Sequence, residues 1–139
     1  MAAATVIDRM ALADAARQAR ERAYAPYSKY QVGAALLASD GRTFTGCNVE
    51  NASYPATTCA ERVAITKAVS EGQRKFLAIA VATSNAAAPC GICRQVMNEF
   101  SREMIVLLVD EEHIVEEHIL ADLLPNSFGP GDLPGVDIQ

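Results

Sequence analysis

The chain has 139 residues, half of them apolar and 21% charged, with a formal net charge of −5. This length suffices for one hydrophobic core and is too short for two, so we expect a single domain over residues 1–139. A protein that follows a phosphate backbone needs a basic stripe, and here 12 Lys and Arg residues are scattered among 17 acidic ones. The composition therefore disfavours a nucleic-acid partner and favours a small neutral ligand.

The sequence carries neither a secretory signal nor a membrane segment that we can identify. The first ten residues lack a basic start followed by an apolar stretch, and no segment approaches the roughly 20 apolar residues that a membrane span requires. We therefore expect no membrane partner and a cytoplasmic location, where thiols stay reduced. The four cysteines are then ligands, catalytic groups or core residues instead of disulfides.

The first expected element is an amphipathic helix over residues 5–24. Small and apolar residues recur there at three- and four-residue spacing, with charged residues on the other side. Thr5 or Asp8 can cap its start, and Pro26 ends it. Apolar runs between turn residues predict the elements that follow: strands over 32–38, 43–49, 76–82 and 104–109, and helices over 59–70 and 89–100.

The order of these elements indicates the fold class. The runs 76–82 and 104–109 are almost continuously apolar, which is typical of strands buried on both faces. Helices alternating with such strands predict a layered α/β sheet with helices on both faces. The segment 114–124 is either a short strand with a helical turn or one helix that ends at Pro125, and the tail 128–139 is expected to be extended.

Three cysteines at two expected helix starts form the strongest chemical signal. Cys90 and Cys93 stand three residues apart after Pro89, and Cys59 precedes Glu61 by two residues. Two cysteines on one helical turn can both reach a tetrahedral zinc ion, and a helix N-terminus favours the thiolate that binds it. Three protein ligands leave a fourth position open, which distinguishes a catalytic zinc site from a structural one. Alone, the Cys-x-x-Cys pair would equally fit a redox pair or half a zinc finger.

Glu61 has two interpretations. An acid in a first helical turn commonly complements the helix dipole. Beside an open zinc site its carboxylate can instead accept a proton from water and pass protons to a ring nitrogen and a departing amine, as in zinc deaminases. Three thiolates outweigh the charge of Zn²⁺, so we expect positive charge nearby, from Arg62 in preference to Arg94. Either arginine can otherwise point to solvent or pair with an acid such as Glu99.

Six motifs span nearly the whole chain: Ala25–Ser28, Val32–Leu36, Gly46–Tyr54, Cys59–Arg62, Pro89–Gln95 and Leu123–Pro130. Together they resemble the cytidine deaminase family, specifically its small homotetrameric branch with three cysteine ligands. The resemblance implies a three-layer α/β/α fold around a five-stranded mixed sheet, with one Zn²⁺ per subunit. It also implies hydrolytic deamination of free cytidine and 2′-deoxycytidine in pyrimidine salvage, by a homotetramer whose active sites are shared between subunits.

The resemblance also implies substrate contacts. Asn48 and Glu50 would hold the ribose hydroxyls, and both fit chemically because alternate residues of a strand point the same way. Taken alone, they are ordinary polar residues at a strand end. The Ala60 backbone would contact the base, Phe128 of a neighbouring subunit would pack over it, and Tyr54 would reach the ligand of an adjacent subunit.

The sequence departs from the family pattern at four places. Tyr30 stands where the family commonly has a phenylalanine near the base, which makes the edge of the pocket more polar. Ala88 replaces a frequent serine, residues 55–57 replace a glycine-containing loop, and residues 110–118 lack the usual Asp-Gly hairpin turn. None is a proposed zinc ligand, so these departures bear on the preference among cytidine analogues.

Three other functions compete with this interpretation. In a structural zinc module Cys47 would be the fourth thiolate, although its position twelve residues before Cys59 favours a buried strand residue. A polynucleotide cytosine deaminase would need a basic groove with stacking aromatics, and the chain has no Trp. A deaminase of an antibiotic such as blasticidin S would not need the ribose motif. His113 and His118 are interpreted as surface histidines and not as metal ligands.

Overall fold

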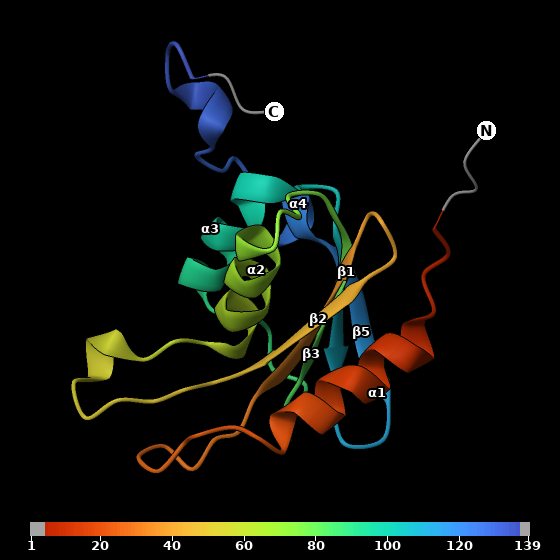
Figure 1. Cartoon of the computed structure of the whole chain (residues 1–139), viewed down its shortest axis with the longest axis vertical. Helices are drawn as coiled ribbons and strands as arrows, with labels where there is room; N and C mark the ends of the chain where they lie inside the picture. The colour runs from red at the N-terminus through yellow and green to blue at the C-terminus, as the bar shows by residue number, and fades with distance from the viewer. Residues whose placement is uncertain (1–4, 137–139) are drawn as a thin grey trace.

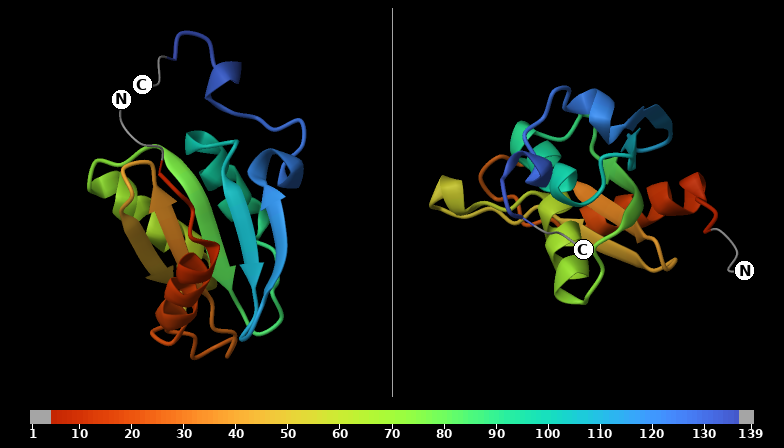
Figure 2. Two further views of the ribbon diagram at one scale, coloured as in Figure 1. Left: turned by 90° about the vertical axis from the view of Figure 1, so that its right-hand side faces the viewer. Right: turned by 90° about the horizontal axis from the view of Figure 1, so that it is seen from above.

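The computed structural model describes residues 5–136, which form a five-stranded sheet in the order β2-β1-β3-β4-β5 (Figure 2). Only β3 and β4 are parallel; the other three neighbouring pairs are antiparallel, so the sheet is mixed as predicted. The strands are β1 (Gly33–Ala38), β2 (Thr43–Cys47), β3 (Phe76–Ala82), β4 (Ile105–Val109) and β5 (Ile114–Ile119). The helices are α1 (Arg9–Arg20), α2 (Ala60–Ser70), α3 (Gly91–Phe100) and α4 (Leu120–Leu123), with short 3₁₀ turns η1 (Tyr54–Ala56) and η2 (Pro130–Asp132).

The helices cover both faces of the sheet, which confirms the three-layer α/β/α prediction. In Figure 1, α1 lies on one side of the strands while α2 and α3 lie on the other. The interior strand β1, between β2 and β3, is buried along its whole length because its side chains alternate between two cores. Leu36 packs in the core under α2 and α3, and Leu37 packs in the core under α1.

Two glycines let the helices approach the sheet closely. A Cβ added at Gly33 would lie 2.1 Å from the carbonyl oxygen of Ala16 in α1, and one at Gly46 would lie 2.5 Å from that of Ala60 in α2. No side chain fits at either position. The contact at Gly46 matters for function because it places the first turn of α2 directly against β2.

Helix α1 is shorter than the predicted 5–24. Its N-cap residue is Asp8, one of the two predicted candidates, and the Asp8 carboxylate accepts a hydrogen bond from the Ala11 amide at 3.1 Å. The helix ends at Arg20 because the next three residues form only tightened i→i−3 hydrogen bonds. Tyr24 then pairs with Val49, so a tertiary contact takes over where the helical pattern in the sequence continues.

The C-terminal third resolves one open alternative and corrects one expectation. Residues 114–124 form a strand followed by a helical turn, so the single-helix alternative is wrong. The turn between β4 and β5 is closed by Asp110, whose carboxylate accepts from the amides of Glu112 and His113, in place of an Asp-Gly turn. The tail is not simply extended, because η2 interrupts it; its last three residues lie outside the described part. Within residues 5–136, none of the helices combines the length and apolar character needed to cross a bilayer.

Candidate metal centre and nucleoside cavity

The three predicted zinc ligands come together at two helix starts. Cys59 is the N-cap residue of α2, Cys90 is the N-cap residue of α3, and Cys93 lies in the first turn of α3. Their Sγ atoms all lie within 4.8 Å of one another. Thiolates bound tetrahedrally at about 2.3 Å from zinc would be about 3.8 Å apart, so the cluster fits zinc after small side-chain shifts. Neither Cys59 nor Cys90 caps its helix through a side-chain hydrogen bond.

The thiols of Cys59 and Cys93 have opposite acidities in the metal-free chain. The pKa of Cys59 falls from 9.0 to about 5, chiefly because Cys93 hydrogen-bonds to it, with Arg62 adding further stabilisation of the thiolate. The pKa of Cys93 rises because it holds the shared proton and is buried. The cluster therefore carries one thiolate near neutral pH before any metal binds.

Arg62 supplies positive charge beside this cluster. Its Nη2 donates to the Cys59 Sγ at 3.3 Å, and the contact raises the pKa of the guanidinium. Its Nε is buried and has no hydrogen-bond partner within residues 5–136. A buried cationic donor beside three thiols suits an anionic metal centre, which is a second reason why zinc fits here.

Glu61 lies next to the cluster and is almost fully buried, with 4% of its surface exposed. Burial is the main reason why the pKa of its carboxyl group is raised, and the nearby Cys59 thiolate raises it further. A raised pKa makes the carboxylate a stronger base than an exposed one, so it accepts a proton more readily. Glu61 is therefore suited to proton transfer.

A cavity of about 280 Å³ opens in front of the cluster and Glu61. Asn48, at its other side, is buried and uses its amide to fix the neighbouring loop: Nδ2 donates to the Tyr30 carbonyl at 2.8 Å, and Oδ1 accepts from the Val32 amide at 2.9 Å. The cavity is lined by Ser28, Tyr30, Val32, Asn48, Glu50, Thr57, Cys59, Ala60, Glu61, Val81, Thr83, Ala87, Ala88 and Cys90.

Glu50 is held as an oriented carboxylate on the same cavity. It accepts hydrogen bonds from the amides of Tyr27 at 2.9 Å and Ser28 at 3.1 Å, and from the Ser28 hydroxyl. The Ser28 hydroxyl is the main reason why the pKa of Glu50 is lowered. Strand β2 ends at Cys47, so Asn48 and Glu50 lie just beyond it, yet extended backbone still directs both into one cavity.

The rim of the cavity contains a hydrogen-bond network that sequence reasoning missed. The Tyr30 hydroxyl donates to Asn85 Oδ1 at 2.6 Å, and the buried Thr83 hydroxyl donates to the same atom at 3.3 Å. Thr83 also accepts from the Ala87 amide at 2.9 Å. The hydroxyl that distinguishes Tyr30 from phenylalanine is thus bound to the opposite loop. The only local signal was the short polar stretch before Pro89.

Three residues singled out from the sequence do not line the cavity, although Tyr54 lines an adjoining hollow together with Glu50. Tyr54 is 71% exposed on η1 and packs edge-on against Tyr27, and Phe128 is 58% exposed in the tail. Arg94 does not approach the thiols; it donates to the carbonyls of Pro89 and Leu123, both at 2.8 Å. Arg94 therefore ties the start of α3 to the end of α4, and neither solvent nor Glu99 is its partner.

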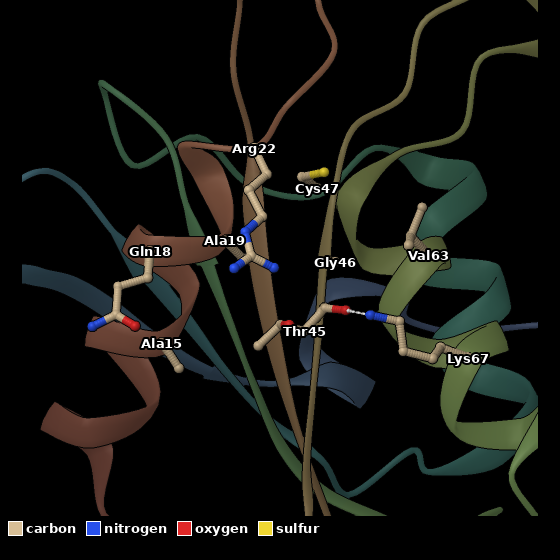
Figure 3. Close-up of a pocket in the computed structure, with 9 residues that line it drawn as sticks. All are labelled: Ala15, Gln18, Ala19, Arg22, Thr45, Gly46, Cys47, Val63 and Lys67. Carbon is tan, nitrogen blue, oxygen red and sulfur yellow. Dashed lines mark hydrogen bonds between the residues drawn. The ribbon is translucent and has the colours of Figure 1, made fainter.

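Cys47 lies outside the thiol cluster, in a second cavity of about 220 Å³. Figure 3 shows it on β2 between α1 and α2, where Lys67 donates to the Thr45 carbonyl. Cys47 is half-buried, so its prediction as a buried residue is wrong. Within residues 5–136 the only metal-binding group of this kind has three members, which leaves Cys47 no place as a fourth ligand.

Comparison with known proteins decides the family. Residues 7–109 match the family model described as the cytidine and deoxycytidylate deaminase zinc-binding region. The chain belongs to the cytidine deaminase family. A cytidine deaminase of Sporosarcina psychrophila is 52% identical over 84% of this chain and 88% of its own, and one of Halalkalibacterium halodurans is 48% identical over 91% and 98%.

Solved structures of cytidine deaminases share this fold. The 1.6 Å crystal structure of the enzyme from Burkholderia pseudomallei has a TM-score of 0.84 at 48% identity and covers 88% of this chain and 100% of its own. The enzyme from Mycobacterium tuberculosis has a TM-score of 0.80 at 42% identity, with coverages of 89% and 99%. These likenesses confirm the family and the fold, and the three-cysteine cluster fits the zinc-binding branch.

Proposed function

We propose that this member of the family hydrolyses the exocyclic C–N bond of free cytidine and 2′-deoxycytidine, releasing ammonia and the corresponding uridine, in pyrimidine salvage. Its cofactor is one zinc ion per chain, held by Cys59, Cys90 and Cys93. The observation that carries the proposal is one cavity with two chemically distinct sides. Two of the three cluster thiols, those of Cys59 and Cys90, and a buried carboxyl group line one part, and an oriented amide and carboxylate line another.

The reaction needs protons to be moved at three atoms, and Glu61 is the group placed to move them. A zinc ion in the thiol cluster supplies Lewis acidity, which makes water nucleophilic near neutral pH. Glu61 accepts a proton from the attacking water and passes it to the ring nitrogen next to the amine-bearing carbon. It then accepts the second proton from the hydroxyl group formed at that carbon and donates it to the departing amine, which leaves as ammonia. Its burial and its raised pKa support this role, because a carboxyl group in water would be too weak a base to regain protons at neutral pH.

Arg62 offsets the negative charge of the ligand set. Three thiolates and one Zn²⁺ sum to a net charge of −1, which weakens the Lewis acid that the reaction requires. The guanidinium 3.3 Å from Cys59 withdraws part of that charge. Its Nε, which is buried and has no hydrogen-bond partner in the described part of the chain, supports the same role.

The sugar is recognised by Asn48 and Glu50. The Glu50 carboxylate is fixed by three donors from Tyr27 and Ser28, so its remaining lone pairs have set directions for ribose hydroxyls. A site built to hydrogen-bond a hydroxyl group discriminates strongly against ligands that lack it. Two other parts of the cavity lining, the Ala60 backbone and the ring of Tyr30, contact the base.

The working enzyme is a homotetramer in which neighbouring copies complete each site. Phe128 is a large apolar side chain that is 58% exposed and far from the cavity of its own chain, and Tyr54 is 71% exposed. Both suit contact with a second copy: Phe128 over the base, Tyr54 near the ligand. Free cysteine ligands favour a reducing compartment, which supports a cytoplasmic location.

The test is the loss of the cytidine absorbance band, followed in parallel with zinc content. Glu61→Gln keeps the size of the side chain and removes its proton transfer, so kcat should fall by about 10²–10⁴-fold while one zinc per chain remains. Glu61→Asp is the matched control that keeps a carboxyl group. Equal turnover by wild type and Glu61→Gln, or a zinc-loaded wild type without activity on either nucleoside, contradicts the proposal. A monomeric mass of an active preparation contradicts the tetramer.

A further inference from the structure

Asn98 is a buried polar residue that the cavity does not use. It lies near the end of α3 with 2% of its surface exposed, and it contacts the C-terminal tail. We propose that Asn98, assisted by Gln95, is a positioning residue that aims the ring of Phe128 at the neighbouring copy. The proposal rests on the function proposed above, in which Phe128 covers the base bound by that copy.

Two side-chain amides from one face of α3 bind the same backbone atom. Asn98 Nδ2 donates to the Phe128 carbonyl oxygen at 3.1 Å, and Gln95 Nε2 donates to it at 2.9 Å. Residues three apart lie on one side of a helix, so the two amides converge without strain. The Ser127 hydroxyl donates to Asn98 Oδ1 at 3.1 Å, so the Asn98 amide fixes two successive tail residues.

The backbone around this anchor leaves little freedom. Asn126 takes a left-handed conformation, with φ 51°, and reverses the chain immediately before the anchored pair. A Cβ at Gly129 would lie 3.2 Å from Asn98 Nδ2, so glycine gives the tail room to approach the buried amide. On the far side, the Gly129 amide donates to the Asp132 carboxylate at 2.8 Å and closes η2.

Phe128 therefore has a fixed backbone and an exposed ring. Phe128 accepts two hydrogen bonds through its carbonyl, yet its side chain is exposed and contributes nothing to the cavity of its own chain. Figure 1 shows the tail projecting from the end of the molecule opposite the loops around residues 27 and 54. Fixing the carbonyl sets the direction of the ring, and preorganisation of this kind improves binding by lowering its entropic cost.

The kinetic test compares Asn98→Leu, Gln95→Ala and Phe128→Ala, alone and combined. Asn98→Leu keeps the shape of the side chain and removes both hydrogen bonds, so KM for cytidine should rise about 5–20-fold with kcat within about twofold. The decisive measurement is Asn98→Leu in the Phe128→Ala background, where no further rise is expected. A merely structural role would multiply the two effects. If Asn98→Leu does not fold, Gln95→Ala repeats the test. Gln95 is exposed, so its replacement should not affect folding, and it removes one of the two hydrogen bonds to the Phe128 carbonyl.

A spectroscopic test measures the ring without using activity. The chain contains no tryptophan, so F128W introduces a single tryptophan at the position in question, which can be excited apart from the four tyrosines. Adding N98L or Q95A to F128W should lower the steady-state anisotropy and increase quenching by acrylamide. Adding L107M, a conservative change in the core on the other face of the sheet, under α1, should do neither.

The outcomes separate the two proposals. If Phe128→Ala leaves KM unchanged, the shared site fails and this inference fails with it. If Phe128→Ala raises KM while the Asn98 and Gln95 variants match wild type, the shared site stands and the positioning role is wrong. The same conclusion holds if the Asn98 or Gln95 variants raise KM by a factor that multiplies the effect of Phe128→Ala. Unchanged anisotropy in F128W/N98L also overturns the positioning role.

Discussion

Replacing Arg62 should weaken zinc binding through the loss of one charge. Its Nη2 lies 3.3 Å from the Cys59 Sγ. Two unit charges at that distance attract by about 5 kcal/mol at an effective dielectric constant of about 20, and by about 1.3 kcal/mol in bulk water. The guanidinium is half-buried, so we expect a value near the lower end. About 2 kcal/mol corresponds to a roughly 30-fold loss of zinc affinity in Arg62→Gln.

The assay is competition for zinc with a chromophoric chelator at several pH values. Arg62→Lys is the matched control, because it keeps the charge and loses only the planar donors. Without the guanidinium the thiol pKa values rise, so protons compete better with zinc as the pH falls. The gap between Arg62→Gln and wild type should therefore widen below pH 7 and narrow in alkaline solution. Equal affinities for all three proteins, or an equal loss in both variants, would refute the charge argument.

Three further predictions concern individual groups. Cys47→Ala should keep one zinc per chain and the kcat/KM of wild type, because Cys47 lines the second cavity; loss of zinc would contradict the three-ligand site. In the metal-stripped chain, thiolate absorbance should show a midpoint near pH 5 that Cys59→Ser abolishes. Because the pKa of Cys59 is lower in the folded chain than in the unfolded one, its thiolate stabilises the folded state. This stabilisation is complete above the unfolded pKa of about 8.5 and is lost as the pH falls through about 5. A midpoint above 8 for the Cys59 thiolate would contradict the prediction. Tyr30→Phe and Asn85→Ala should each raise KM about 3–10-fold, and the double variant should be no worse than either; additive effects would rule out a functional bond between them.

Much of the cysteine cluster could be predicted because part of its signal is local. Cys90 and Cys93 share one helical turn, and Cys59 and Glu61 share another, so spacing indicates which side chains can meet within each turn, while the approach of the two turns is a tertiary contact. The resemblance to a family was needed for Asn48, whose role depends on a cavity wall that is distant in sequence.

What the sequence did not reveal depends on tertiary contacts. Thr83 and Asn85 belong to a loop of small residues, and only its approach to Tyr30 turns them into the rim of a cavity. Asn98 has the pattern of an ordinary helix residue until the tail folds back over it. The end of α1 was misjudged for the same reason, because pairing between Tyr24 and Val49 competes with helix propagation.

The two helix starts that hold the cysteines also show a conflict between activity and stability. Cys59 and Cys90 occupy positions where serine or aspartate would accept a hydrogen bond from the helix backbone, and neither cysteine does so. An unfilled cap costs about 1 kcal/mol per helix. Cys90→Asp should therefore raise the melting temperature of the metal-free protein while destroying its metal site. At this position the free chain lacks the stability that a capping side chain would add, which is the expected cost of keeping a thiol available for a bound ligand.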